Sequence, residues 1–140
     1  MRLLLDANIF LEVLLEQQQA EVAGELLEND AAHELCVSDF ALHAVCLIAL
    51  RQRAFQVLRQ FLEDAVIPGS LNILVIPPAE LTEVLDAVHS LGLDFDDAYQ
   101  YVLAEKQGLT LVSFDKDFDH TPRGRQKPQA ILQITNNPTP

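Results

Sequence analysis

Short runs of consecutive apolar residues alternate along the chain with longer stretches in which apolar residues recur every three or four positions. The first pattern is typical of a buried strand and the second of a helix with one apolar face. Strands are therefore predicted over residues 2–5, 34–37, 72–76 and 109–114. Helices are predicted to begin at Asp6-Ala7-Asn8, to span residues 20–29, 38–50, 51–67 and 94–107, and to run from Pro77-Pro78 to Gly92.

Strands that alternate with helices predict an α/β fold, a three-layer α/β/α sandwich with a mainly parallel central sheet. One domain covers residues 1–140, because the chain is of single-domain length. The tail, residues 120–140, is predicted to be rich in loops with one short strand at 130–135. The helix over 38–50 is apolar almost all round, which predicts burial on most of its sides.

The composition excludes several classes of protein. The 140 residues include 21 acidic and 9 basic side chains, a net charge of −12 that argues against a general nucleic-acid coat. No apolar run is long enough to span a membrane, and the first residues show no targeting signal. Cys36 and Cys46 lie in apolar stretches without pairing spacing, as expected for free thiols in the cytoplasm.

Acidic residues gather where the predicted strands end. Asp6 follows the first strand and Asp115 the last, while Asp97 opens the helix between them. The carboxyl ends of parallel strands share one edge of the sheet, so these carboxylates are expected to meet. Seven acidic residues and two lysines lie between positions 94 and 119, and Mg²⁺ or Mn²⁺ would offset that charge. The alternative is that Asp6 and Asp96 only cap helices.

Three segments resemble, in order, the motifs of PIN-domain proteins, a family that includes the VapC-type toxins of bacterial toxin–antitoxin pairs. They are LLLDANIF at 3–10, LDFDDAYQYVLAEK at 93–106 and LTLVSFDKDF at 109–118. The resemblance implies an α/β/α sandwich with an acidic pocket that holds Mg²⁺ or Mn²⁺. It also implies metal-dependent endonucleolytic cleavage, usually of RNA, by a protein that forms a homodimer and is inhibited by a cognate antitoxin.

The resemblance assigns roles to six residues. Asp6, Asp97 and Asp115 would be the catalytic metal ligands, and Asp117 would assist them. Asn8 would order the loop beside Asp6, and Ser113 would hydrogen-bond a carboxylate. Three acids suffice to hold one ion.

One family feature is absent. PIN proteins usually carry a glutamate in the helix after the second strand, and here the matching place falls at His43 or Ala44. An imidazole ligand in that place would favour Mn²⁺ or another transition metal as the bound ion. The other interpretation is a buried, hydrogen-bonded histidine beside a pocket that has lost one ligand.

Three functional hypotheses follow. The first is a metal-dependent endoribonuclease, the toxin of a toxin–antitoxin pair; the second is a PIN-fold protein that has lost catalysis and binds protein or RNA. The third is a phosphatase-like domain with Asp6 as nucleophile, against which Asn8 stands where such enzymes carry an aspartate. The basic cluster Arg123, Arg125 and Lys127 is expected either to contact phosphate or to balance nearby acids.

Overall fold

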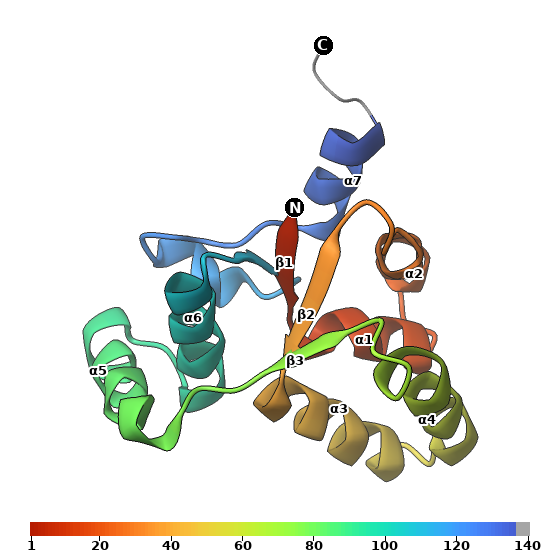
Figure 1. Cartoon of the computed structure of the whole chain (residues 1–140), viewed down its shortest axis with the longest axis horizontal. Coiled ribbons are helices and arrows are strands. Elements are labelled where there is room, and N and C mark those ends of the chain that lie inside the picture. Colours follow the sequence, from red (N-terminus) through yellow and green to blue (C-terminus); the bar gives the residue numbers. More distant parts are fainter. Residues whose placement is uncertain (137–140) are drawn as a thin grey trace.

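A four-stranded parallel sheet of strand order β3-β2-β1-β4 runs through the centre of the computed structural model, which describes residues 1–136 (Figure 1). The strands are β1 (Arg2–Leu5), β2 (Glu34–Ser38), β3 (Asn72–Leu74) and β4 (Thr110–Val112). The register pairs Leu4 with Cys36 across β1 and β2, and with Leu111 across β1 and β4. The four strands predicted over residues 2–5, 34–37, 72–76 and 109–114 are present, although β3 and β4 are shorter than the apolar runs that contain them.

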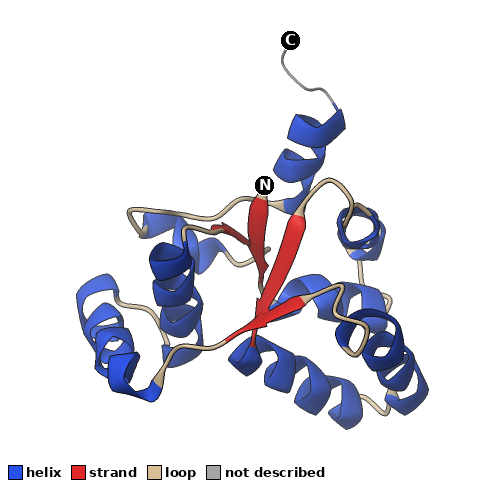
Figure 2. Ribbon diagram, viewed as in Figure 1, coloured by secondary structure: helices blue, strands red, loops and turns tan. Residues whose placement is uncertain are grey.

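Helices cover both faces of the sheet (Figure 2). One face carries α1 (Ala7–Leu14), α2 (Ala20–Glu28), α3 (Asp39–Arg51), α4 (Phe55–Phe61) and α7 (Pro128–Asn136). The other carries α5 (Leu81–Leu91) and α6 (Phe95–Gln107). Leu3 and Leu5 of β1 point into the first core and Leu4 into the second, as strand alternation requires. The predicted α/β/α sandwich is confirmed.

The helix predicted over residues 51–67 is two segments. Arg53 takes a left-handed backbone conformation, with φ of 59°, and breaks the chain between α3 and α4. A π-helical segment, Leu62–Val66, then continues from α4. Two 3₁₀ turns, Pro78–Glu80 and Lys116–His120, precede α5 and follow β4.

Two sequence expectations are wrong. Residues 130–135 form part of helix α7 and not a strand, because Pro128 begins the helix and Ile131 and Leu132 are buried on one side of it. The prediction for residues 137–140 lies outside the described residues. Helix α3 is buried on one face only, since Phe40, Leu47 and Leu50 are all at least 39% exposed.

Two composition-based expectations can be compared with the structure. Within residues 1–136, no helix is both long and apolar enough to cross a bilayer. Cys36 is buried and Cys46 is half-buried, and both are free thiols.

Candidate active site

Asp6 leaves the end of β1 and is held by three hydrogen bonds. Its Oδ1 accepts from the Ala7 backbone N–H at 2.8 Å, so it does cap helix α1. Its Oδ2 accepts from the Ser113 hydroxyl at 2.7 Å and from the Asn8 amide at 3.5 Å. Burial raises the pKa of Asp6, and the Ser113 hydrogen bond opposes part of that rise.

Asn8 and Ser113 join the loop after β1 to the loop after β4. The Asn8 amide donates to Ser113 Oγ at 3.1 Å, and Asn8 Oδ1 accepts from the Phe114 N–H at 3.3 Å. Ser113 Oγ also accepts from the Asp115 N–H at 2.9 Å. The two side chains therefore fix the position of Asp115 relative to Asp6, across more than 100 residues of sequence.

Helix α6 and the turn after β4 bring further carboxylates together. One oxygen from each of Asp97, Asp115 and Asp117 can be chosen so that all three atoms lie within 4.8 Å of one another. Asp94, Asp96 and Asp97 form a second such group, which shares Asp97 with the first. Asp94 stands at the N-cap of α6 and makes no side-chain capping bond. Asp6 belongs to neither group but is close enough to raise the pKa of Asp97.

Crowding by these carboxylates raises the pKa of Asp97. Asp97 is 8% exposed. Burial, followed by the charges of four neighbouring aspartates, raises its pKa to about 7. The neighbours are, from largest effect to smallest, Asp96, Asp115, Asp6 and Asp117. In the absence of a bound cation, ionisation of Asp97 therefore costs free energy. A cation close to the carboxylates would lower that cost.

The chemistry of these donors fits a hard divalent cation. Mg²⁺ and Mn²⁺ prefer carboxylate and water oxygens, and Asp97, Asp115 and Asp117 supply carboxylate oxygens at compatible separations. The crowded carboxylates otherwise lack compensation, as the raised pKa of Asp97 shows. Their role as metal ligands stays a prediction.

The structure does not support either interpretation of His43. Its side chain is exposed, so it is not a buried, hydrogen-bonded histidine, and it joins neither group of clustered acids. His43 instead lines a surface groove with Leu47, Leu50 and Ile73. Ala44, the other position matched to the family glutamate, is half-buried and offers no ligand atom.

The basic loop follows the 3₁₀ turn Lys116–His120, and its arginine Arg125 pairs with an acid outside the two groups of clustered carboxylates. The Arg125 side chain is 5% exposed; it pairs with Asp119 at 2.9 Å and donates to the Ser113 carbonyl at 3.0 Å. Its guanidinium lowers the pKa of Asp119. For Arg125, the balancing of a local acid is therefore the role that the structure shows. Lys127 is exposed, and its charge also lowers the pKa of Asp119.

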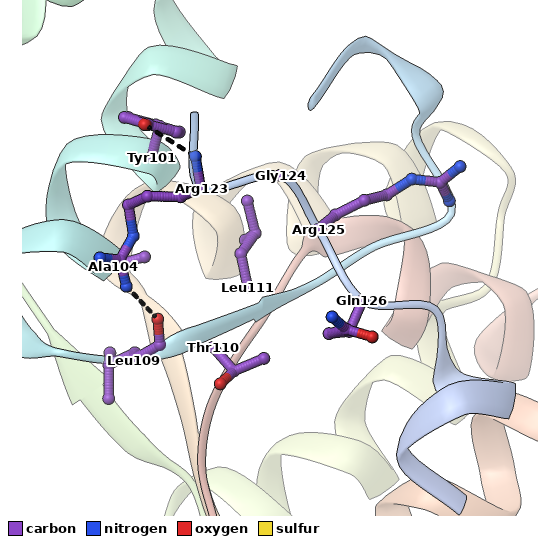
Figure 3. Close-up of a pocket in the computed structure, with 9 residues that line it drawn as sticks. All are labelled: Tyr101, Ala104, Leu109, Thr110, Leu111, Arg123, Gly124, Arg125 and Gln126. Atoms are coloured by element: carbon purple, nitrogen blue, oxygen red, sulfur yellow. Dashed lines mark hydrogen bonds between the residues drawn. The ribbon is translucent and has the colours of Figure 1, made fainter. Parts of the chain in front are cut away.

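Arg123 lies over a cavity of about 240 Å³ beside β4 (Figure 3). Its guanidinium donates to the Leu109 carbonyl at 3.0 Å, and its backbone N–H donates to the Tyr101 hydroxyl at 3.2 Å. Leu109 precedes β4, so this cavity is near the amino end of the strand. Asp115 and Asp117 lie beyond its carboxyl end, whereas the Arg123 side chain is hydrogen-bonded to Leu109 at the other end.

Two residues near the acids were not singled out as site residues from the sequence. Asp96 contributes most to the pKa of Asp97 after burial, and its place beside Asp97 at the start of a helix was the available signal. Gln100 is a buried amide one turn further along α6, and its only signal was a polar residue among apolar ones.

A parallel sheet between helical layers, with carboxylates gathered at its carboxyl edge, defines an α/β protein with a candidate cation site. The chain belongs to the PIN domain family, whose model matches residues 3–124. A comparison with curated protein sequences gives no significant match.

Solved structures of the same fold come from several organisms. PAE2754 from Pyrobaculum aerophilum is 18% identical, with a TM-score of 0.71 over 98% of this chain and 97% of that one. A toxin–antitoxin complex from Klebsiella pneumoniae is 24% identical, with a TM-score of 0.67 over 89% of this chain and 96% of that one. VapBC2 from Rickettsia felis, bound to a DNA fragment from its promoter, is 17% identical. Its TM-score is 0.68 over 91% of this chain and 98% of that one. At these identities the likeness shows the fold.

Proposed function

We propose that this protein is a metal-dependent endoribonuclease and the toxin of a toxin–antitoxin pair. The observation that carries the proposal is the convergence of Asp97, Asp115 and Asp117 within 4.8 Å, with the pKa of Asp97 raised to about 7. Membership of the PIN family and the toxin–antitoxin complexes among its structural neighbours support it. The free thiols agree with a cytoplasmic location.

In this proposal Asp97, Asp115 and Asp117 would hold Mg²⁺ or Mn²⁺, and Asp6 would add its negative charge to the same site. A bound divalent cation supplies a Lewis acid that acidifies water and stabilises the charge developing on a phosphodiester. Ser113 and Asn8 keep Asp6 oriented, because both donate to its Oδ2. Asp97 would have to lose its proton to act as a ligand, since its pKa of about 7 leaves it partly protonated near neutral pH.

The proposal is tested by incubating the purified protein with single-stranded RNA, in EDTA and in millimolar Mn²⁺ or Mg²⁺. We expect internal cleavage that requires the ion, together with little cleavage of DNA of the same sequence. RNA that stays intact in every ion would contradict the enzymatic proposal. The absence of the helix glutamate, with His43 or Ala44 in its place, would then favour the alternative of a PIN-fold module that binds protein or RNA.

The proposed partner is a cognate antitoxin that brings an arginine to the acids. A guanidinium pairs with carboxylates through two parallel hydrogen bonds, and it would compete with the metal ion for Asp97 and Asp115. The expected mark of such a partner is inhibition of cleavage at equimolar antitoxin. An antitoxin with that arginine changed to alanine is expected to bind but to inhibit less.

A second copy of the chain is the other proposed partner. Leu47 and Leu50 of α3 are exposed and line a groove of about 450 Å³ with Ile73. Large exposed apolar patches mark association surfaces. Light scattering at micromolar concentration is expected to give twice the mass of one chain, and a Leu47→Glu variant is expected to give the mass of one.

A further inference from the structure

Phe40, Phe95 and Tyr99 form an aromatic cluster where helices α3 and α6 begin. Phe40 of α3 packs against Phe95 of α6, with ring centroids 5.8 Å apart and ring planes tilted by 55°. Tyr99, one helical turn beyond Phe95, stacks on Phe40 at 5.4 Å and 29° and contacts Phe95 at 6.4 Å. Aromatic pairs are favourable at such separations. The three rings therefore make one continuous surface.

The aromatic cluster is fixed on its buried side and open on its outer side. Tyr99 is 4% exposed, and its hydroxyl donates to Asp39 Oδ1 at 2.8 Å and accepts from the Ile76 N–H at 2.9 Å. Phe40 and Phe95 are 39% and 40% exposed. Contact of apolar surface with water costs free energy, which a ligand covering the two rings would recover. Because Tyr99 is held in place, the outer rings are preorganised for such a ligand.

The aromatic cluster borders the acids at the carboxyl edge of the sheet. Phe95 stands between Asp94 and Asp96 in the chain, so its Cα atom is about 3.8 Å from each of theirs. Asp94 and Asp96 belong to one of the two groups of clustered carboxylates. Phe40 lies two residues after Ser38, the last residue of β2, and so at the same edge. A strand of RNA whose phosphodiester lies at the acids would have an adjoining base beside these rings.

The charge around the aromatic cluster favours a nucleobase over a second copy of the chain. Asp39, Asp94 and Asp96 are all exposed and are the neighbours of the two rings in sequence. A twofold interface centred on the rings would bring these acids against those of the other copy, and facing like charges oppose association. A nucleobase is uncharged and stacks on aromatic rings through its π-face. Its phosphate would lie with the proposed cation.

We propose that Phe40 and Phe95 stack on an unpaired nucleobase of the RNA, next to the phosphodiester at the acids. This inference rests on the proposed ribonuclease function and adds the feature that selects the substrate. Bases in a duplex are stacked on one another, whereas those of single-stranded loops and ends are free to stack on aromatic side chains. The substrate class is therefore single-stranded RNA, with little preference for one base because every base has a π-face.

The test compares Phe40→Ala and Phe95→Ala with Phe55→Ala, which removes an exposed ring from α4. Phe95→Leu keeps an apolar side chain without a ring and Phe95→Tyr keeps the ring, while urea unfolding establishes that each variant folds. Binding of a labelled single-stranded RNA is followed by fluorescence anisotropy with Ca²⁺ in place of Mn²⁺. A second probe, an abasic strand with the same sugar–phosphate backbone, reports binding that does not involve bases.

We expect Phe40→Ala and Phe95→Ala each to bind RNA about tenfold more weakly, the usual loss when a ring that stacks on a base is removed. Phe95→Leu should lose as much, whereas Phe95→Tyr and Phe55→Ala should keep the wild-type affinity. The abasic strand should bind the wild type and the alanine variants equally. The rise in melting temperature with Mn²⁺ alone should be the same in every variant, because a phenyl ring does not ligate the ion.

Wild-type RNA affinity in Phe40→Ala and Phe95→Ala, while the wild type still cleaves RNA, would overturn this inference alone. An equal loss of affinity for the abasic strand would also overturn it, because the rings would then not act on a base. Alanine variants that keep their RNA affinity but no longer dimerise would assign the rings to a protein interface instead. A wild type that neither binds nor cleaves RNA would overturn the proposed function with it.

Discussion

Replacement of Asp97 by asparagine is expected to abolish RNA cleavage and, without metal, to make the protein more stable. Asp97 lies in both groups of clustered carboxylates, so its loss removes a predicted ligand from either arrangement. Loss of one group that stabilises the transition state electrostatically commonly costs a factor of about 10² to 10³ in rate. Cleavage by Asp97→Asn in Mn²⁺ should therefore fall by at least about 10²-fold, measured as the initial rate on single-stranded RNA.

The stability effect has a sign that follows from the raised pKa of Asp97. The folded protein binds its proton up to a pH of about 7, and the unfolded chain only up to about 3.8. The protonated carboxyl therefore contributes stability that is complete below pH 3.8 and is lost as the pH rises through about 7. At pH 8 in EDTA, the neutral amide should raise the melting temperature by about 3 °C or more, and at pH 4 the gain should vanish.

Asp86→Asn is the matched control for both effects. Asp86 is exposed on α5 and belongs to neither group of clustered carboxylates, yet the substitution removes the same charge. It should leave the cleavage rate and the melting temperature near their wild-type values. An Asp97→Asn protein that cleaves RNA at the wild-type rate would refute the role of Asp97.

The second large effect is a loss of metal affinity in acid. A proton and the cation compete for Asp97, whose pKa is about 7. One competing proton with that pKa should weaken the apparent affinity for Mn²⁺ about a hundredfold between pH 8 and pH 5. Isothermal titration with Mn²⁺ at pH 8, 7, 6 and 5 measures the dependence.

The Asp97→Asn variant tests whether Asp97 is the group that binds the competing proton. Its affinity for Mn²⁺ should be low at pH 8 and should change less with pH, since the competing proton is gone. An affinity of the wild-type protein that stays constant from pH 8 to pH 5 would exclude Asp97 as the group that exchanges its proton for the ion.

The order of strands and helices could be predicted because each apolar run encodes its own local pattern. The run at residues 2–5 is too short for a helix, and Gly92 and Gly108 end α5 and α6 in left-handed conformations that favour glycine. Residues 130–135 were misassigned because a short segment with two isoleucines satisfies both patterns. Ile131 packs in the first core and Leu132 is also buried, as the helical spacing of α7 allows.

The candidate site could be predicted only in part. Asp6 and Asp115 follow strands, so the topology of a parallel sheet is enough to bring them to one edge. His43 was misjudged because one helix face cannot be told from another when nearly the whole helix is apolar. The contact between Ser38 and Gln100 joins residues 62 positions apart, and no local pattern in the sequence reports it.

The position of a bound ion tests the central claim most directly. Crystals grown with Mn²⁺ at pH 8 should show an anomalous scattering peak among the carboxylates of Asp97, Asp115 and Asp117, on the side that faces Asp6. The same experiment on Asp97→Asn should show the peak weakened or lost. A wild-type crystal with Mn²⁺ in the solution and no peak between Asp97 and Asp115, or with its peak elsewhere, would contradict the assignment of these acids as a metal site.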